Sequence, residues 1–135
     1  MKKIRVGVIG LGFIGKQHVE ALRRLPYIEI VAGSDSNLGM REWCEKNGIQ
    51  KYYSDYKEML TNEKMDVVHN CTPNNFHYEV SCEILKTGCH VYSEKPLTIK
   101  SVEGESLIEL ADKKGLKTAV NFNYRNNLMV QEIQQ

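Results

Sequence analysis

The stretch Gly10-Leu11-Gly12-Phe13-Ile14-Gly15 decides the fold of this chain. It follows a strand-like run at residues 4–9 and leads into a helical pattern at residues 16–22. A G-x-G-x-x-G turn between a strand and a helix is typical of dinucleotide-binding domains. The first glycine allows a sharp turn, the second lets a pyrophosphate approach the backbone, and the third lets the helix pack against the strand. Free N–H groups at the helix start, around Phe13 and Ile14, then face the anion.

A second strand-like run ends in Asp35, about 20 positions after the glycine turn. An acidic residue at that place holds the two hydroxyls of the adenosine ribose. Because a carboxylate repels a 2′-phosphate, Asp35 favours NAD over NADP. Arg41 is in principle able to receive that phosphate. An ordinary exposed helix arginine is the favoured interpretation, so NADP stays the less favoured alternative. The other interpretation of Asp35 is a turn or helix-capping aspartate.

The composition is that of one globular domain with no special partner. The 135 residues are 41% hydrophobic and 26% charged, and the net charge of +1 gives no sign of a nucleic-acid surface. No apolar run approaches the length of a membrane span, so we expect a cytoplasmic protein. The four cysteines form no C-x-x-C pair and suggest neither a disulfide framework nor a zinc site.

Strand-like and helical patterns alternate along the rest of the chain. Helices are predicted at about residues 14–25, 38–47, 56–60, 75–87 and 101–114, and strands at about 28–34, 51–53, 66–71, 89–94 and 117–122. Leu38, Met40, Trp43 and Cys44 are available for the inner face of the second helix. This alternation predicts a doubly wound α/β fold, with a parallel sheet and helices on both faces.

In such a fold the ligand lies outside the carboxyl ends of the strands. Besides the glycine turn and Asp35, that rule selects the loop Thr72-Pro73-Asn74 and the turn Glu94-Lys95-Pro96. Thr72 and Asn74 are suited to hydrogen-bond the ribose or the nicotinamide amide. We therefore expect all four places to line one edge of the sheet.

Lys95 is the strongest candidate for a catalytic residue. An amine beside a bound nicotinamide can hydrogen-bond a substrate hydroxyl and assist proton removal as hydride leaves the same carbon. Glu94 would orient the lysine or offset its charge. The alternative for Lys95 is a solvated loop lysine.

Histidines complete the set of candidates. His77 either faces the cofactor pocket or serves in packing, and we interpret His18, on the first helix, as structural. His69 and Cys71 share one face of a strand. There, buried strand residues are favoured over a metal site, and no metal ligand is predicted.

These residues together resemble the N-terminal half of the Gfo/Idh/MocA family, the glucose–fructose oxidoreductase and inositol dehydrogenase group. The resemblance covers the whole chain, and the glycine turn combined with Glu-Lys-Pro is more specific than either motif alone. The matching positions are Gly10, Gly12, Gly15, His18, Asp35, Cys71-Thr72-Pro73-Asn74, His77, Glu79, Glu94-Lys95-Pro96-Leu97 and Asn121-Phe122-Asn123-Tyr124-Arg125.

The resemblance implies an NAD(P)-dependent oxidoreductase with a Rossmann fold that acts on sugars, cyclitols or related polyols. It assigns Lys95 to substrate positioning and proton handling, and the segment from Thr72 to Asn74 to the cofactor. Family members also carry a second α/β domain that binds substrate and often forms the interface of a homo-oligomer.

We accordingly expect a dinucleotide-binding domain at residues 1–124, followed at 125–135 by the start of a segment toward a second domain. Residues 129–135 are predicted to begin a helix. The chain by itself should bind dinucleotide without turning over a substrate, as a piece of a longer enzyme. The alternative is a stand-alone dinucleotide-binding sensor or subunit, although a sensor has no need of a lysine beside the nicotinamide.

Overall fold

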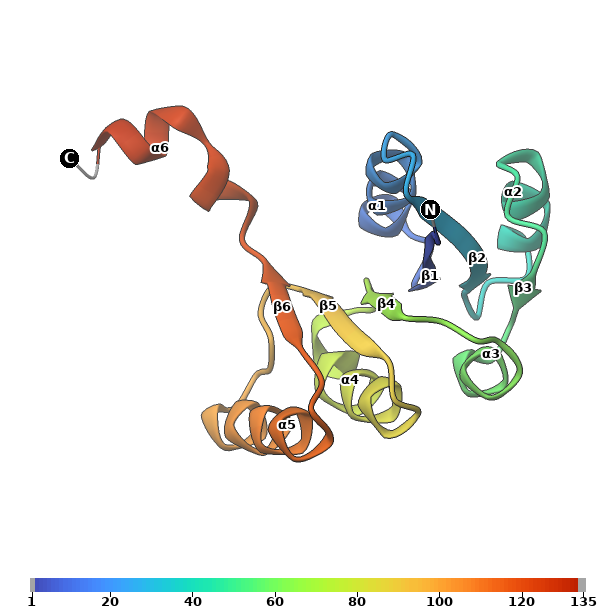
Figure 1. The fold of residues 1–135 in the computed structure, drawn as a ribbon. Coiled ribbons are helices and arrows are strands. Elements are labelled where there is room, and N and C mark those ends of the chain that lie inside the picture. Colours follow the sequence, from blue (N-terminus) through green and yellow to red (C-terminus); the bar gives the residue numbers. More distant parts are fainter. Residues whose placement is uncertain (1, 134–135) are drawn as a thin grey trace.

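The sheet is built around β1 (Ile4–Ile9), the strand that runs into the glycine turn. The computed structural model describes residues 2–133, with the backbone alone for residue 126. Within these residues six strands pair in parallel in the order β3-β2-β1-β4-β5-β6 (Figure 1), so the predicted doubly wound fold is confirmed. The other strands are β2 (Ile28–Ser34), β3 (Tyr52–Tyr53), β4 (Val67–Asn70), β5 (His90–Glu94) and β6 (Thr118–Asn121).

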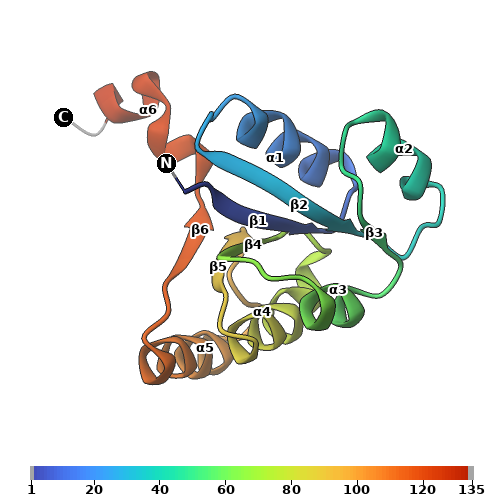
Figure 2. The same ribbon diagram turned by 45° about the vertical axis from the view of Figure 1, so that its right-hand side comes forward.

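Helices cover both faces of the sheet. Figure 2 shows α1 (Phe13–Arg23) and α2 (Met40–Lys46) on one face, and α3 (Tyr56–Asn62), α4 (His77–Lys86) and α5 (Ser101–Lys114) on the other. After β6 come the short helix η2 (Asn123–Asn126) and α6 (Leu128–Ile133), which extends away from the sheet. Among residues 2–133, no helix combines the length and the apolar character needed to cross a membrane.

Two hydrophobic cores lie on opposite faces of the sheet because side chains alternate along each strand. In β1, Val6 and Val8 join the core beneath α1 and α2, whereas Gly7 faces Met59 and Met65 on the other side. The first core consists of Val6, Val8, Leu11, Val19, Leu22, Cys44 and Ile49. The second includes Met59, Leu60, Val68, Val80, Ile84, Leu85, Val91, Leu107 and Ala111.

The second helix is shorter than its predicted range of 38–47. Asp35 accepts a hydrogen bond from the Asn37 N–H, and Asn37 in turn accepts one from the Gly39 N–H. These two turns occupy the backbone up to Gly39, so α2 begins only at Met40. Leu38 consequently lies outside the helix and is 67% exposed, which corrects its expected place on the inner face.

Other boundaries differ by at most two residues from their predicted positions. The third strand is only Tyr52–Tyr53, because it pairs with no more than Gly33 and Ser34 of β2. The helix expected from residue 75 starts with the 3-10 turn η1 (Asn74–Phe76) after Pro73 and becomes α-helical at His77. Of the helix expected at 129–135, the described part is α6, and residues 134–135 lie outside the described residues.

The glycine turn brings three backbone segments into close contact. Gly10 has a φ of +86°, and a Cβ there would lie 2.5 Å from the Cys71 carbonyl oxygen at the end of β4. A Cβ on Gly15 would overlap the carbonyl oxygen of Gly10. At Gly12, by contrast, a Cβ would have no described atom within 4 Å. Gly10 and Gly15 are therefore required by packing, and Gly12 borders open space.

We predict that alanine at Gly15 destabilises the fold far more than alanine at Gly12. Gly15→Ala forces α1 away from the turn and should lower the free energy of unfolding by about 3 kcal/mol or more. Gly12→Ala changes only the N-cap and should cost about 1 kcal/mol or less. Urea unfolding of both variants measures the difference, and equal losses would contradict this account of the turn.

Candidate functional site

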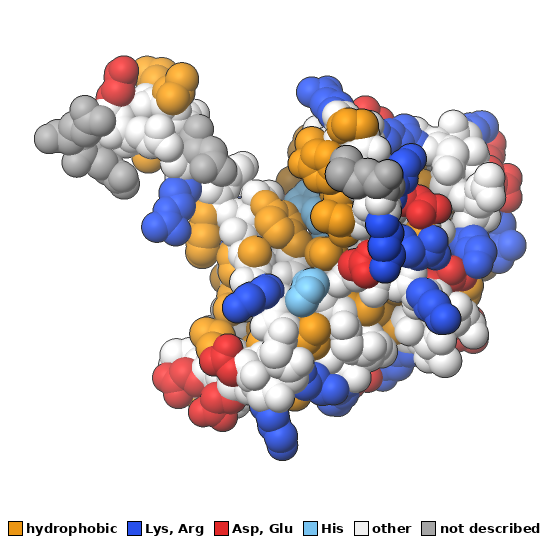
Figure 3. All heavy atoms as spheres, in the orientation of Figure 1, with side chains coloured by type: hydrophobic (Ala, Val, Ile, Leu, Met, Phe, Trp, Pro, Cys, Tyr) orange, Lys and Arg blue, Asp and Glu red, His pale blue; other side chains and the backbone are white. Residues whose placement is uncertain are grey.

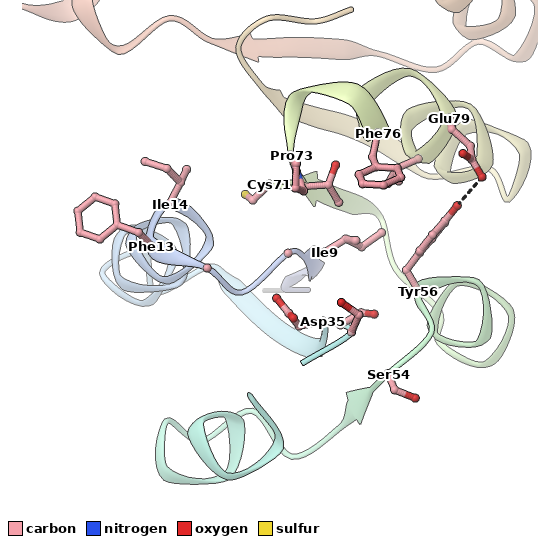
Figure 4. A pocket seen from close by; sticks show the side chains of 16 residues that line it. Ile9, Phe13, Ile14, Asp35, Ser54, Tyr56, Cys71, Pro73, Phe76 and Glu79 are labelled. Atoms are coloured by element: carbon pink, nitrogen blue, oxygen red, sulfur yellow. Dashed lines mark hydrogen bonds between the residues drawn. The ribbon is translucent and has the colours of Figure 1, made fainter. Parts of the chain in front are cut away.

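A cavity of about 610 Å³ lies at the carboxyl ends of β1, β2 and β4. Figure 4 shows the side chains around it, with Asp35 at the end of β2 and Pro73 and Phe76 on the loop after β4. This is the edge of the sheet where the strand-end rule predicts a ligand. The lining residues are Ile9, Gly10, Gly12, Phe13, Ile14, Ser34, Asp35, Ser36, Ser54, Tyr56, Cys71, Thr72, Pro73, Phe76, Glu79 and Val80.

The start of α1 forms one wall of this cavity. Gly12 is the N-cap, and having no side chain it leaves the first N–H groups of the helix uncapped. Phe13 and Ile14 belong to that first turn, and Phe13 is 78% exposed. Since a Cβ at Gly12 would fill the open space in front of these amides, the wall fits a pyrophosphate bound against the backbone.

Asp35 both faces the cavity and braces the glycine turn. Its Oδ2 accepts a hydrogen bond of 2.7 Å from the Leu11 N–H, and its Oδ1 accepts one of 2.8 Å from the Asn37 N–H. Asp35 therefore does form a turn, which is one of the two interpretations of this residue. Each carboxylate oxygen has a second lone pair, so the group can still accept bonds from a ribose diol.

Arg41 lies over the ring of Tyr52, with its guanidinium carbon 5.3 Å from the ring centroid. The Tyr52 hydroxyl donates to the carbonyl oxygen of Asp35 at 2.5 Å. Arg41 thus has a stacking partner on β3, next to the end of β2.

Tyr56 and Glu79 stand at the far side of the cavity, and sequence reasoning did not select Tyr56. The Tyr56 hydroxyl lies 3.5 Å from Glu79 Oε1 (Figure 4). Burial, followed by the charge of Glu79, raises the pKa of Tyr56 to about 12, so the phenol remains a hydrogen-bond donor. No local signal could have found this pair, because the two side chains meet only when α3 packs beside α4.

Asn70 organises the loop that follows β4, and sequence reasoning missed it as well. Its side chain is fully buried, and its amide donates to the His77 carbonyl oxygen at 3.0 Å and to Ser81 Oγ at 2.9 Å. Its Oδ1 accepts a 2.7 Å bond from the Thr72 hydroxyl. A polar residue ending an apolar strand was the available signal. Asn70 thereby fixes the backbone on which Thr72, Pro73 and Asn74 lie.

His77 is buried, and its ring binds backbone rather than open space. Nε2 lies 2.7 Å from the carbonyl oxygen of Thr72, and Nδ1 lies 2.6 Å from that of Pro96. His77 therefore connects the loop after β4 to the turn after β5. This geometry corresponds to the interpretation of His77 as a packing residue in the wall of the site.

A second cavity of about 560 Å³ holds the remaining candidates. Lys95 directly follows β5 and is joined to Pro96 by a cis peptide bond, and its side chain is exposed at this cavity. Phe13, Ile14, Cys71 and Thr72 line both cavities, so the two adjoin at the start of α1. The other lining residues are Gln17, His18, Asn74, His77, Glu94, Asn121, Asn123 and Tyr124.

Glu94 is held in the wall of this second cavity by hydrogen bonds. Its Oε1 accepts from Asn121 Nδ2 at 2.6 Å and lies 2.8 Å from His18 Nε2, and its Oε2 accepts from the Lys95 N–H at 3.3 Å. Burial raises the pKa of the Glu94 carboxyl, but the bonds from Asn121 and His18 outweigh it and the pKa lies below its ordinary value. The group is an ionised acceptor.

His69 and Cys71 lie beneath this network. Burial, reinforced by His18, lowers the pKa of His69 to about 3, and its ring stacks on Tyr92 with 4.7 Å between centroids. Burial raises the pKa of the Cys71 thiol, which stays protonated. The Nδ1 of His69 is bonded to His18, as expected for a buried strand residue with a satisfied polar group.

Comparison with known proteins gives the family of this architecture. Residues 4–122 match the family described as an oxidoreductase family with an NAD-binding Rossmann fold, GFO_IDH_MocA. D-glucoside 3-dehydrogenase of Escherichia coli is 34% identical over 98% of this chain, and myo-inositol 2-dehydrogenase of Thermotoga maritima is 35% identical over 90%. The WlbA dehydrogenase of Bordetella pertussis, solved with NADH and UDP-GlcNAcA, has a TM-score of 0.91 at 27% identity and covers 98% of this chain.

The aligned region is a minor part of each of these proteins. It makes up 38% of the glucoside dehydrogenase, 37% of the inositol dehydrogenase and 40% of the WlbA chain. It corresponds to the NAD-binding part of the family. The chain belongs to the Gfo/Idh/MocA oxidoreductase family and comprises its NAD-binding Rossmann domain.

Proposed function

We propose that this domain binds NAD for a dehydrogenase that oxidises a hydroxyl of a sugar, a cyclitol or a related polyol. The observation that carries the proposal is the pairing of two adjoining cavities, one faced by Asp35 and the other by Lys95. A dinucleotide has two ends of different chemistry, and these cavities offer a matching pair of environments. NAD, when bound, supplies the hydride acceptor.

The binding roles follow from the residues around the first cavity. The uncapped N–H groups at the start of α1 would hold the pyrophosphate, with Gly12 leaving room for it. Asp35 would accept hydrogen bonds from the ribose diol while it remains bonded to Leu11 and Asn37. Thr72, Pro73 and Asn74 would contact the middle of the dinucleotide.

The reacting end would lie in the second cavity. Lys95 would hydrogen-bond the substrate hydroxyl and accept its proton as the carbinol carbon loses hydride, leaving a carbonyl product. Glu94 has its oxygens engaged by Asn121, His18 and the Lys95 N–H, so it would orient the lysine and not act as a second base. The amide and phenol groups of Asn123 and Tyr124 suit a polyhydroxylated substrate.

We place this activity in a longer polypeptide in which residues 1–124 are the cofactor domain and the segment from 125 leads toward a substrate domain. Leu128, Met129 and Ile133 of α6 are at least 74% exposed, which suits a helix that packs against further protein. Basic and acidic side chains both occur on the face shown in Figure 3, and the net charge of +1 favours a small-molecule partner over a nucleic acid. The free thiols suit the cytoplasm, and a homo-oligomer would follow the family pattern.

We predict that the domain binds NADH at least about tenfold more tightly than NADPH, because the Asp35 carboxylate repels a 2′-phosphate. Asp35→Asn removes that charge but keeps an oxygen that can accept a backbone N–H, so the preference should shrink. Calorimetric titration of this chain with both cofactors measures it. Glu20→Gln, the same change on the exposed side of α1, is the control, and tighter NADPH binding by the unchanged chain would refute the role of Asp35.

We also predict that Lys95→Ala leaves NAD affinity within about twofold, because the lysine acts on the substrate. In a polypeptide that contains this domain and is as long as the relatives, the same change should lower turnover by about 10²–10⁴-fold. Calorimetry and steady-state rates measure the two effects. Lys100→Ala changes another exposed lysine beyond the same turn and should preserve turnover; a normal rate in Lys95→Ala excludes that lysine from the reaction.

A further inference from the structure

His18 links the helix that follows the glycine turn to the end of β5. Its ring lies in the interior, with a side chain only 7% exposed. Nε2 is 2.8 Å from Glu94 Oε1, and Nδ1 is 2.8 Å from Nδ1 of His69. The contacts span α1, β4 and β5, so His18 joins three elements at the floor of the second cavity.

Counting protons gives the direction of the bond from His18 to Glu94. An ionised carboxylate can only accept, so His18 Nε2 carries a hydrogen and donates it to Glu94. The two facing Nδ1 atoms are too close for two hydrogens, so one proton lies between them. Because both nitrogens of His18 are engaged, the ring has a single orientation.

Glu94 transmits this orientation to the turn that carries Lys95. One of its oxygens is shared by His18 and Asn121, and the other accepts the Lys95 N–H at 3.3 Å. The Tyr92 hydroxyl donates to Asn121 Oδ1 at 3.2 Å, which orients the amide that faces Glu94. The backbone at Lys95 is thus bonded to a carboxylate that is itself held from two directions.

We propose that His18 is a positioning residue for Lys95, which it holds through Glu94 at a set distance from the helix that binds the cofactor phosphates. The inference rests on the proposed function of Lys95 and gives His18 a role beyond engaging an oxygen of Glu94. His18 lies on the same short helix as Phe13 and Ile14, whose uncapped N–H groups would face the pyrophosphate. One rigid element would therefore locate both the cofactor and the base.

Three variants separate this role from general stability. His18→Leu removes both bonds of the ring, and His18→Gln keeps an N–H donor for Glu94. Val19→Ala is the control, because Val19 is fully buried on the same helix but belongs to the core beneath α1 and is not bonded to Glu94. It weakens the packing of the helix on the sheet without removing a bond to Glu94.

The first measurement is the carboxyl titration of Glu94 in this chain, followed by carbon NMR. The unchanged chain and Val19→Ala should titrate Glu94 below ordinary glutamates, and His18→Leu should raise its midpoint, with His18→Gln between them. An unchanged midpoint in His18→Leu would overturn the contact. If His18→Leu does not fold, the Glu94 midpoint of His18→Gln is compared with that of Val19→Ala. Equal midpoints in these two variants would then overturn the contact.

The second measurement is turnover in a protein of the relatives' length. His18→Leu should lower kcat at least about tenfold with KM for NAD within about twofold, while His18→Gln recovers part of the rate and Val19→Ala keeps it. Equal losses in His18→Leu and Val19→Ala would overturn the positioning role. Lys95→Ala, run alongside, separates the two proposals: if it abolishes turnover and His18→Leu does not, only the inference about His18 fails. Normal turnover in Lys95→Ala refutes the proposed function and the positioning role with it, whatever the Glu94 titration gives.

Discussion

The close approach of three backbone segments at the glycine turn is the constraint on which the rest depends. Gly10 passes beside the end of β4, and Gly15 packs against the carbonyl of Gly10. Only residues without a Cβ permit both contacts, so α1 can start directly against β1 and β4. That start leaves uncapped N–H groups beside the space in front of Gly12. One packing requirement therefore produces both the central layer of the fold and the uncapped helix start that borders the open space at Gly12.

Asp35 and two buried residues hold the walls of the two cavities together. Asp35 is bonded to the glycine turn through the Leu11 N–H while it faces the cavity. Asn70 orders the loop after β4, and His77 connects that loop to the turn after β5. These hydrogen bonds hold the cavity walls in place more firmly than the loop conformations would alone. They favour a preorganised site.

The second cavity is organised around a buried ionised carboxylate. Glu94 accepts hydrogen bonds from β6, α1 and its own turn. These donors, and not solvent, stabilise its negative charge. His69 stays neutral beneath it because burial, followed by the neighbouring His18, disfavours the charged form of its ring. A carboxylate whose oxygens are already engaged is compatible with the proposed role of Lys95 as the group that accepts the proton.

The sequence alone determined the alternation of strands and helices, the position of the glycine turn and the placing of Asp35, Thr72 and Lys95 at strand ends, because these follow from local periodicity and from residues with special backbone properties. The start of α2 is also set locally, by the side-chain turns at Asp35 and Asn37. Only the tertiary structure decided that Asn70 bonds to Ser81 of α4, and that His18 meets His69 and Glu94. Those contacts join residues up to 76 positions apart. Their partners are set by how helices pack on the sheet, and no local pattern records that packing.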